Sequence, residues 1–190
     1  MKKDAKKQQD RSSKSLKRII LLGYMASGKS FIGKRLAKKI ELPFIDLDDY
    51  IEKKEELSVS QLFSKKGEDY FRQKEFFYLK EILALNDSFV LSLGGGTPLL
   101  KDAMQLINKE GQSFYLEASV QTLFERLQPN EVERPILNEI DKDFLRSYID
   151  LHLAQRIPFY KLADKTISID GLDVNEIVEL IKLITNTINV

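Results

Sequence analysis

One eight-residue stretch restricts the fold of this chain more than any other part of its sequence. The letters GYMASGKS, residues 23–30, fit the pattern GxxxxGK[ST]. They follow the apolar run Ile19 to Leu22 and precede a helical pattern with an apolar face from Ile32 to Ile40. A glycine-containing loop between a buried strand and an amphipathic helix is the setting in which this pattern binds phosphate.

Each fixed position of the motif has a physical role in binding a nucleoside triphosphate. The glycines let the backbone curl around phosphate oxygens, and the amide donors at the helix N-terminus stabilise their negative charge. Lys29 reaches the outer phosphates, and Ser30 can ligate Mg²⁺. We therefore predict that ATP or GTP is bound with Mg²⁺, through Gly23, Ala26, Ser27, Gly28, Lys29, Ser30 and Phe31.

Five apolar runs alternate with helical patterns along the chain. They cover residues 19–22, 42–48, 89–93, 113–116 and 166–169. We interpret 42–48 as a strand leading into a loop, and the helical pattern over 58–85 is broken near Gly67. Strands alternating with helices indicate a parallel sheet covered on both faces, so the expected class is α/β with three layers.

The composition predicts one domain with a basic tail. A length of 190 residues with 43% hydrophobic composition suits a single core. Residues 1–18 carry a net charge of +6, which leaves −5 for the rest of the chain. We predict a disordered tail over 1–17 and a single domain over 18–190, with a mobile lid at about 128–139, a polar segment with two prolines between two helical patterns.

Several classes of function are excluded by composition. The chain has no cysteine and only one histidine, so thiolate zinc sites and multi-histidine metal sites are absent. His152 has no motif around it, and we leave it out of the site.

No apolar run is long enough to span a bilayer, so we expect a cytoplasmic protein that binds neither membrane nor nucleic acid. We expect a monomer, and we assign the tail no function, although a basic arm could grip a polyanion.

Acidic residues and glycines follow two of the predicted strands, at the edge of the sheet where open parallel sheets bind ligands. Asp46 and Asp48 alternate at a strand end, so one can face Mg²⁺ while the other reaches an acceptor hydroxyl. Gly94, Gly95 and Gly96 follow the strand at 89–93, either as a simple turn or as a place where a substrate meets backbone amides.

Arginines indicate the charge of the acceptor. Arg72 and Glu75 are one helical turn apart and can pair. Guanidinium groups bind carboxylates bidentately, so a site with Arg72 and Arg156 would select an acidic acceptor over a neutral sugar.

The phosphate motif alone does not identify a reaction, because it occurs in kinases, motor ATPases, switch GTPases and transport subunits. The chain lacks the Asn-Lys-x-Asp stretch that reads guanine and is short for a mechanical ATPase. A small-molecule kinase fits best. Alternatives are kinases acting on gluconate or a nucleoside monophosphate, or a non-catalytic nucleotide-binding regulator.

The chain resembles the shikimate kinase family. The stretches GYMASGKS, FIDLDD, GEDYFRQKE, LSLGGG, ERPIL and AQRIPFY occur in family order between residue 18 and about 180. The resemblance implies a P-loop fold like that of nucleoside monophosphate kinases, with a parallel five-stranded sheet and a mobile lid. It also implies transfer of the γ-phosphate of ATP to the 3-hydroxyl of shikimate, giving shikimate 3-phosphate and ADP.

The same resemblance assigns roles to individual residues. Glu75 would orient Arg72, Arg126 would meet the nucleotide, and Ser30 and Asp46 would hold the metal. The implied catalytic residues are Lys29, Asp48 and Arg134, with Arg134 on the lid. Shikimate would be bound by Asp48, Arg72, Gly94, Gly95, Gly96, Arg134 and Arg156. One departure is Ala26, where the family usually has glycine.

Overall fold

The fold is built on a sheet whose five strands all run in the same direction. The computed structural model describes residues 17–128 and 142–187. Its strands are β1 (Arg18–Leu22), β2 (Phe44–Asp46), β3 (Phe89–Ser92), β4 (Gln112–Glu117) and β5 (Lys165–Ser168). They lie in the order β2-β3-β1-β4-β5 with parallel pairing throughout. The α/β class and the five strands predicted from the sequence are confirmed.

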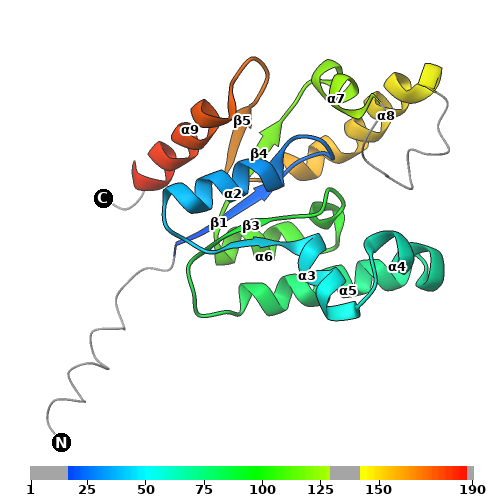
Figure 1. Cartoon of the computed structure of the whole chain (residues 1–190), viewed down its shortest axis with the longest axis horizontal. Helices are drawn as coiled ribbons and strands as arrows, with labels where there is room; N and C mark the ends of the chain where they lie inside the picture. The colour runs from blue at the N-terminus through cyan, green and yellow to red at the C-terminus, as the bar shows by residue number, and fades with distance from the viewer. Residues whose placement is uncertain (1–16, 129–141, 188–190) are drawn as a thin grey trace, which may run out of the picture.

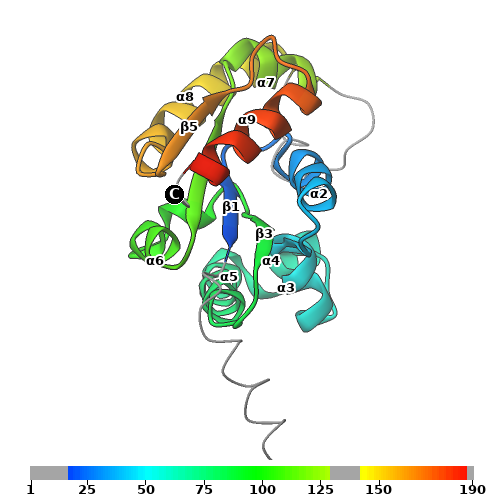
Figure 2. The same cartoon turned by 90° about the vertical axis from the view of Figure 1, so that its left-hand side faces the viewer.

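Helices cover the sheet on both faces, which gives the three expected layers (Figure 1). On one face α2 (Lys29–Lys39) packs against α9 (Val174–Thr187), while α6 (Ala103–Glu110) and α8 (Lys142–Tyr160) lie on the other (Figure 2). Next to α6 lies α5 (Glu68–Leu83). The remaining elements are α3 (Leu47–Glu55), α4 (Val59–Lys66), the 3₁₀ turn η1 (Thr97–Leu99) and α7 (Val120–Leu127).

The central strand β1 is completely buried over its apolar residues. Ile19 to Leu22 of β1 are all 0% exposed, because this strand has a strand on each side and helices on each face. A strand buried on both faces is selected to be apolar at every position rather than at every second one. The helix boundaries also follow the sequence, since α4 and α5 meet at Gly67 and Asp173 caps α9 in a reciprocal pair with Glu176.

The second strand corrects one prediction. β2 ends at Asp46 and α3 begins at once with Leu47, so the expected loop and the alternation of Asp46 and Asp48 along a strand are both wrong. Asp46 caps the helix, because its Oδ1 accepts a hydrogen bond of 3.1 Å from the amide of Asp48. The alternating pattern of FIDLD resembles a strand, but Asp46 within it is a typical N-cap residue and was the signal that a helix begins here.

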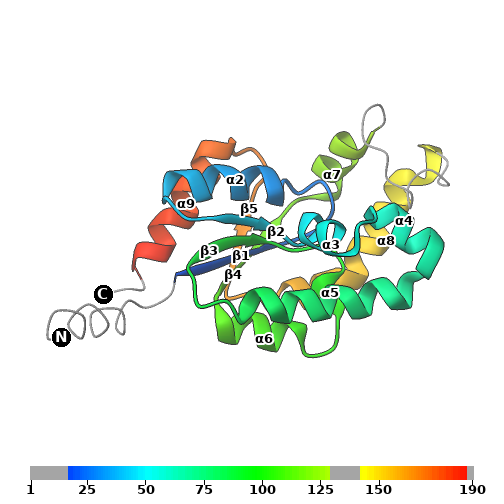
Figure 3. The same ribbon diagram turned by 60° about the horizontal axis from the view of Figure 1, so that its bottom comes forward.

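The sheet topology brings the predicted site residues to one edge. The carboxyl ends of β1, β2 and β3 meet there. β2 and β3 lie on one side of β1, and β4 and β5 lie on the other, so this edge is at the switch point of the topology. Figure 3 shows α3, α7 and α8 gathered beyond this edge. The predicted tail up to residue 16 and the lid with Arg134 lie outside the described residues. Within the described ranges, no helix combines the length and apolar character needed to cross a bilayer.

Candidate active site

The phosphate loop, residues 23–30, is shaped to receive an anion. Gly28 forms the N-cap of α2 in a left-handed conformation, with φ of 92°. No side chain of the described residues caps this helix end, which leaves its first-turn amides available to a ligand. The hydroxyl of Ser27 is fully buried and has no partner within the described ranges. Such an unsatisfied donor beside open amides fits a phosphate group.

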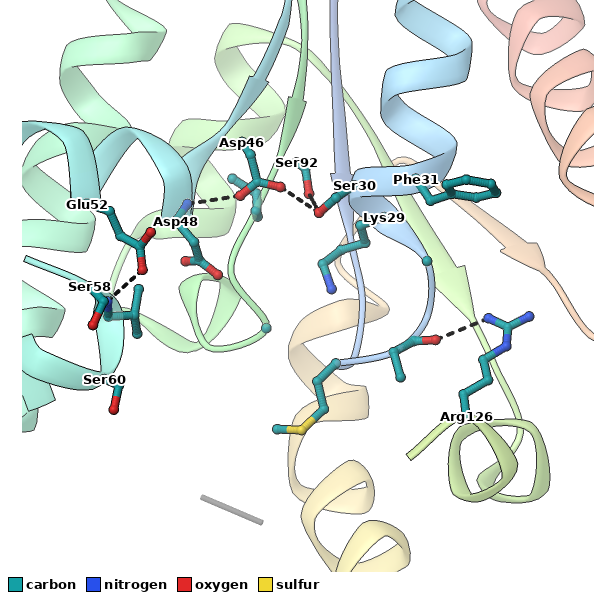
Figure 4. Close-up of a pocket in the computed structure, with 16 residues that line it drawn as sticks. Lys29, Ser30, Phe31, Asp46, Asp48, Glu52, Ser58, Ser60, Ser92 and Arg126 are labelled. Atoms are coloured by element: carbon teal, nitrogen blue, oxygen red, sulfur yellow. Dashed lines mark hydrogen bonds between the residues drawn. The ribbon is translucent and has the colours of Figure 1, made fainter. Parts of the chain in front are cut away.

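Lys29 and Arg126 bring positive charge to this loop. The Nζ of Lys29 donates to the carbonyls of Gly23 at 3.0 Å and Tyr24 at 2.9 Å, so its ammonium lies inside the loop (Figure 4). Arg126 of α7 donates from Nη1 to the carbonyl of Ala26 at 3.1 Å. Ala26 itself has φ of 63°, a left-handed conformation that alanine adopts at a cost. The loop geometry is therefore kept despite the missing glycine.

Hard oxygen ligands meet beside the loop. The hydroxyl of Ser30 donates to Oδ2 of Asp46 at 2.5 Å, and the Oγ of Ser92 lies 3.4 Å from that hydroxyl. Ser30 lies in the first turn of α2, Asp46 ends β2 and Ser92 ends β3, so three elements converge on one point (Figure 4). Sequence reasoning missed Ser92, although its place at the end of a buried strand is a signal for this edge.

Asp48 projects from the first turn of α3 into a cavity of about 820 Å³ that the phosphate loop also lines. Burial, followed by the negative charges of Glu75 and Asp46, raises the pKa of Asp48 to about 7, against the opposing effect of Lys29. A carboxyl with this pKa can exchange a proton near neutral pH. Glu52 lines the same cavity and was missed, although it follows Asp48 by one helical turn. Its Oε1 accepts the amide of Val59 at 2.7 Å.

The acceptor side of the site is organised by a buried carboxylate. Glu75 is 0% exposed and accepts from Nη1 of Arg72 at 2.6 Å and from Oγ1 of Thr97 at 2.5 Å. A Cβ built on Gly96 would lie only 2.5 Å from Nη1 of Arg72. Glycine is therefore required at position 96 so that this arginine can lie against the turn, and the pairing of Arg72 with Glu75 is confirmed.

A second arginine contacts the same glycine turn from α8. The Nη1 of Arg156 donates to the carbonyl of Gly95 at 2.9 Å, as does the hydroxyl of Tyr160 at 2.7 Å. Gly95 lines the cavity, whereas the two arginines contact the turn beside it. Arg156 is also hydrogen-bonded to His152, a residue that no sequence motif marked as part of the site.

The fold and this site together are those of a P-loop kinase that acts on a small molecule. A family model described as shikimate kinase matches residues 25–185 of the chain. The chain belongs to the shikimate kinase family.

Individual relatives agree with the family match. A shikimate kinase of Flavobacterium psychrophilum is 42% identical over 165 residues, which are 86% of this chain and 96% of that protein. The crystal structure of a shikimate kinase from Bacteroides thetaiotaomicron superposes with a TM-score of 0.85 at 35% identity, over 90% of this chain and 99% of the other. A shikimate kinase of Acinetobacter baumannii in complex with shikimate gives 0.82 at 27% identity, over 91% and 95%.

Proposed function

We propose that this protein transfers the γ-phosphate of ATP to the 3-hydroxyl of shikimate, giving shikimate 3-phosphate and ADP. The observation that carries the proposal is that Lys29 of the phosphate loop and Asp48 line one cavity. Phosphoryl transfer depends mainly on alignment and charge stabilisation, so donor and acceptor must meet in one enclosed place. The Acinetobacter baumannii relative in complex with shikimate supports the choice of acceptor.

The nucleotide would be held by the phosphate loop. Its open amides, the buried hydroxyl of Ser27 and the ammonium of Lys29 match an anionic triphosphate in charge and hydrogen-bonding capacity. Ser30 and Asp46 offer the oxygen ligands that Mg²⁺ prefers, which it commonly combines with phosphate oxygens. When bound, the metal neutralises charge on the transferred group.

Asp48 would bind the acceptor hydroxyl and take its proton. Its carboxylate faces the cavity that the ammonium of Lys29 also borders, and its pKa of about 7 makes it a suitable base near neutral pH. Ionised Asp48 would also repel the carboxylate of the acceptor, so the hydroxyl-bearing side of the acceptor would face Asp48. It therefore orients the acceptor as well as activating it.

The carboxylate of the acceptor would be bound by arginine forks. Arg72 is held by Glu75 and Arg156 by Gly95 and His152, so both guanidinium groups are positioned before the acceptor arrives. Bidentate arginine contacts select a planar carboxylate. Arg134 of the lid segment remains a predicted contributor.

The alternatives are less well supported. Family membership favours shikimate over gluconate or a nucleoside monophosphate as acceptor, and favours catalysis over a regulatory role. We also keep the predictions that the protein is a cytoplasmic monomer that uses Mg²⁺ and does not bind nucleic acid.

ADP release in the presence of ATP and Mg²⁺ tests the proposal, with shikimate, gluconate or no acceptor. We expect stimulation by shikimate alone. Arg72→Ala should raise the KM for shikimate about 10- to 100-fold, as expected for loss of a charged hydrogen bond, with little change in the KM for ATP. Arg146→Ala is the matched control, because Arg146 lies on the surface and contacts Gln121. If neither acid stimulates a protein that still binds ATP, the regulator alternative is favoured.

A further inference from the structure

The guanidinium of Arg156 is fixed on two of its edges. Its Nε and Nη2 lie 3.2 and 2.7 Å from Nε2 of His152, one helical turn earlier on α8, and its Nη1 donates to the carbonyl of Gly95. A guanidinium has five N–H groups. The hydroxyl of Tyr160 interacts with the same guanidinium and donates to the same carbonyl. The forked donors of a guanidinium suit a planar carboxylate.

The other ring nitrogen of His152 is anchored on the phosphate loop. Its Nδ1 lies 2.7 Å from the hydroxyl of Tyr24, the second residue of that loop. Tyr24 is only 1% exposed. The rings of Tyr24 and His152 also meet edge to face at 5.5 Å, and the ring of Tyr148 lies 5.0 Å from that of His152. The imidazole therefore has a defined position between the loop and the arginine.

The chemistry of the partners defines the protonation of the ring. An arginine can only donate, so Nε2 of His152 must present a lone pair to Arg156. The neutral ring then carries its proton on Nδ1 and donates it to the oxygen of Tyr24. Burial, and then the positive charge of Arg156, lower the pKa of His152 to about 4, in agreement with a neutral ring.

We propose that His152 is a positioning residue, which holds Arg156 in the orientation that binds the acceptor carboxylate and ties it to the phosphate loop through Tyr24. This inference rests on the proposed function for the nature of the acceptor. An arginine that is ordered in advance loses less side-chain entropy when the carboxylate binds, so it binds more tightly. The contact also links the two halves of the site, because Tyr24 belongs to the loop that holds the nucleotide.

The tautomer can be observed directly, because His152 is the only histidine of the chain. Protein labelled with ¹⁵N-histidine, and without a histidine tag, gives the NMR signals of this one ring. We expect a proton on Nδ1, a bare Nε2 and no titration between pH 8 and 5.5. A proton on Nε2, or titration near the ordinary value of 6.5, overturns the proposal. This readout does not depend on which acceptor the enzyme uses.

Two substitutions separate positioning from simple packing. The oxygen of Gln reaches approximately to the place of Nε2 and can accept from Arg156, whereas Asn reaches only to the place of Nδ1. We expect His152→Asn to raise the KM for shikimate about tenfold with the KM for ATP changed less than twofold. His152→Gln should recover most of that loss, and Leu151→Gln, at an exposed neighbouring position, should change neither constant.

The outcomes are distinguishable from failure of the proposed function. Equal KM values for shikimate in wild type, His152→Asn and His152→Gln would overturn the positioning role, as would equal losses in both variants. Absence of shikimate-dependent ADP release in wild type would instead refute the proposed acceptor, and the NMR result would still decide the orientation of the ring. Circular dichroism and thermal melting establish that each variant is folded.

Discussion

At the scale of single residues, the ionised form of Asp48 that suits catalysis also lowers the stability of the folded protein. Its pKa is about 7 in the folded protein and has an ordinary value of 3.8, so the folded state binds more protons than the unfolded state between these values. The stability contributed by protonated Asp48 is complete below about pH 4 and is lost as the pH rises through about 7. At pH 8 the ionised group opposes folding, because it is buried and because it faces the negative charges of Glu75 and Asp46.

Asp48→Asn should therefore stabilise the fold while abolishing activity. At pH 8 we expect a gain of about 1–3 kcal/mol in the free energy of unfolding, and a much smaller gain at pH 5. Urea titrations at both pH values measure the two differences, with Asp49→Asn, at an exposed neighbouring position, as the control. A variant that is equally stable or less stable than wild type at pH 8 would contradict the interpretation.

Much of the site could be predicted residue by residue where a local pattern carries the chemistry. The loop from Gly23 to Ser30 is such a pattern, because the shape of its backbone depends on neighbours in sequence. The role of His152 could not be predicted, since its partner Tyr24 lies 128 positions away. A lone histidine on a helix has no local feature that separates a surface position from a contact with a distant loop.

At the scale of elements, the carboxylate of Glu55 joins α3 to α5 on the acceptor side of the site. Glu55 at the end of α3 accepts from Tyr70 at 2.7 Å and from Tyr78 at 2.6 Å, and pairs with Lys74 at 2.7 Å. These three partners are spaced four residues apart on one face of α5. Burial acts to raise the pKa of Glu55, but the hydrogen bonds outweigh it and lower that pKa to about 2.

Glu55→Gln should loosen the joint between α3 and α5. At pH 7 we expect a loss of about 1.5–3 kcal/mol in the free energy of unfolding, the usual value of a hydrogen bond to a charged group. The KM for shikimate should rise as well, because α3 carries Asp48 and α5 carries Arg72. Urea unfolding and steady-state kinetics measure the two effects.

The control for this prediction lies between the same helices. Glu81 accepts from Tyr50 at 2.6 Å and pairs with Lys54 at 2.7 Å, but its side chain is 36% exposed, against 11% for Glu55. Exposed ion pairs contribute little to stability. Glu81→Gln should therefore change stability much less than Glu55→Gln, and equal losses would show that burial does not decide the contribution.

At the scale of the whole molecule, the sequence predicted the class of fold but not the order of the strands in the sheet. Alternating apolar runs and helical patterns identified all five strands, because strands buried on both faces are apolar throughout. The order β2-β3-β1-β4-β5 depends on pairing between strands far apart in the chain, which no local pattern records. The beginning of α3 was missed for a related reason, since an alternating stretch fits a strand and a capped helix equally well.

Three strand ends meet at the site, so a ligand bound there should stabilise the domain as a unit. A ligand at 100 times its Kd adds about 2.7 kcal/mol, which in a domain of this size raises the Tm by about 5–10 °C. We expect this shift for ADP with Mg²⁺, a much smaller one for ADP with EDTA, and none for Lys29→Ala. Differential scanning calorimetry measures all three. An undiminished shift in EDTA would mean that Ser30 and Asp46 do not hold a metal with the nucleotide, because removing the ion must weaken binding if they do.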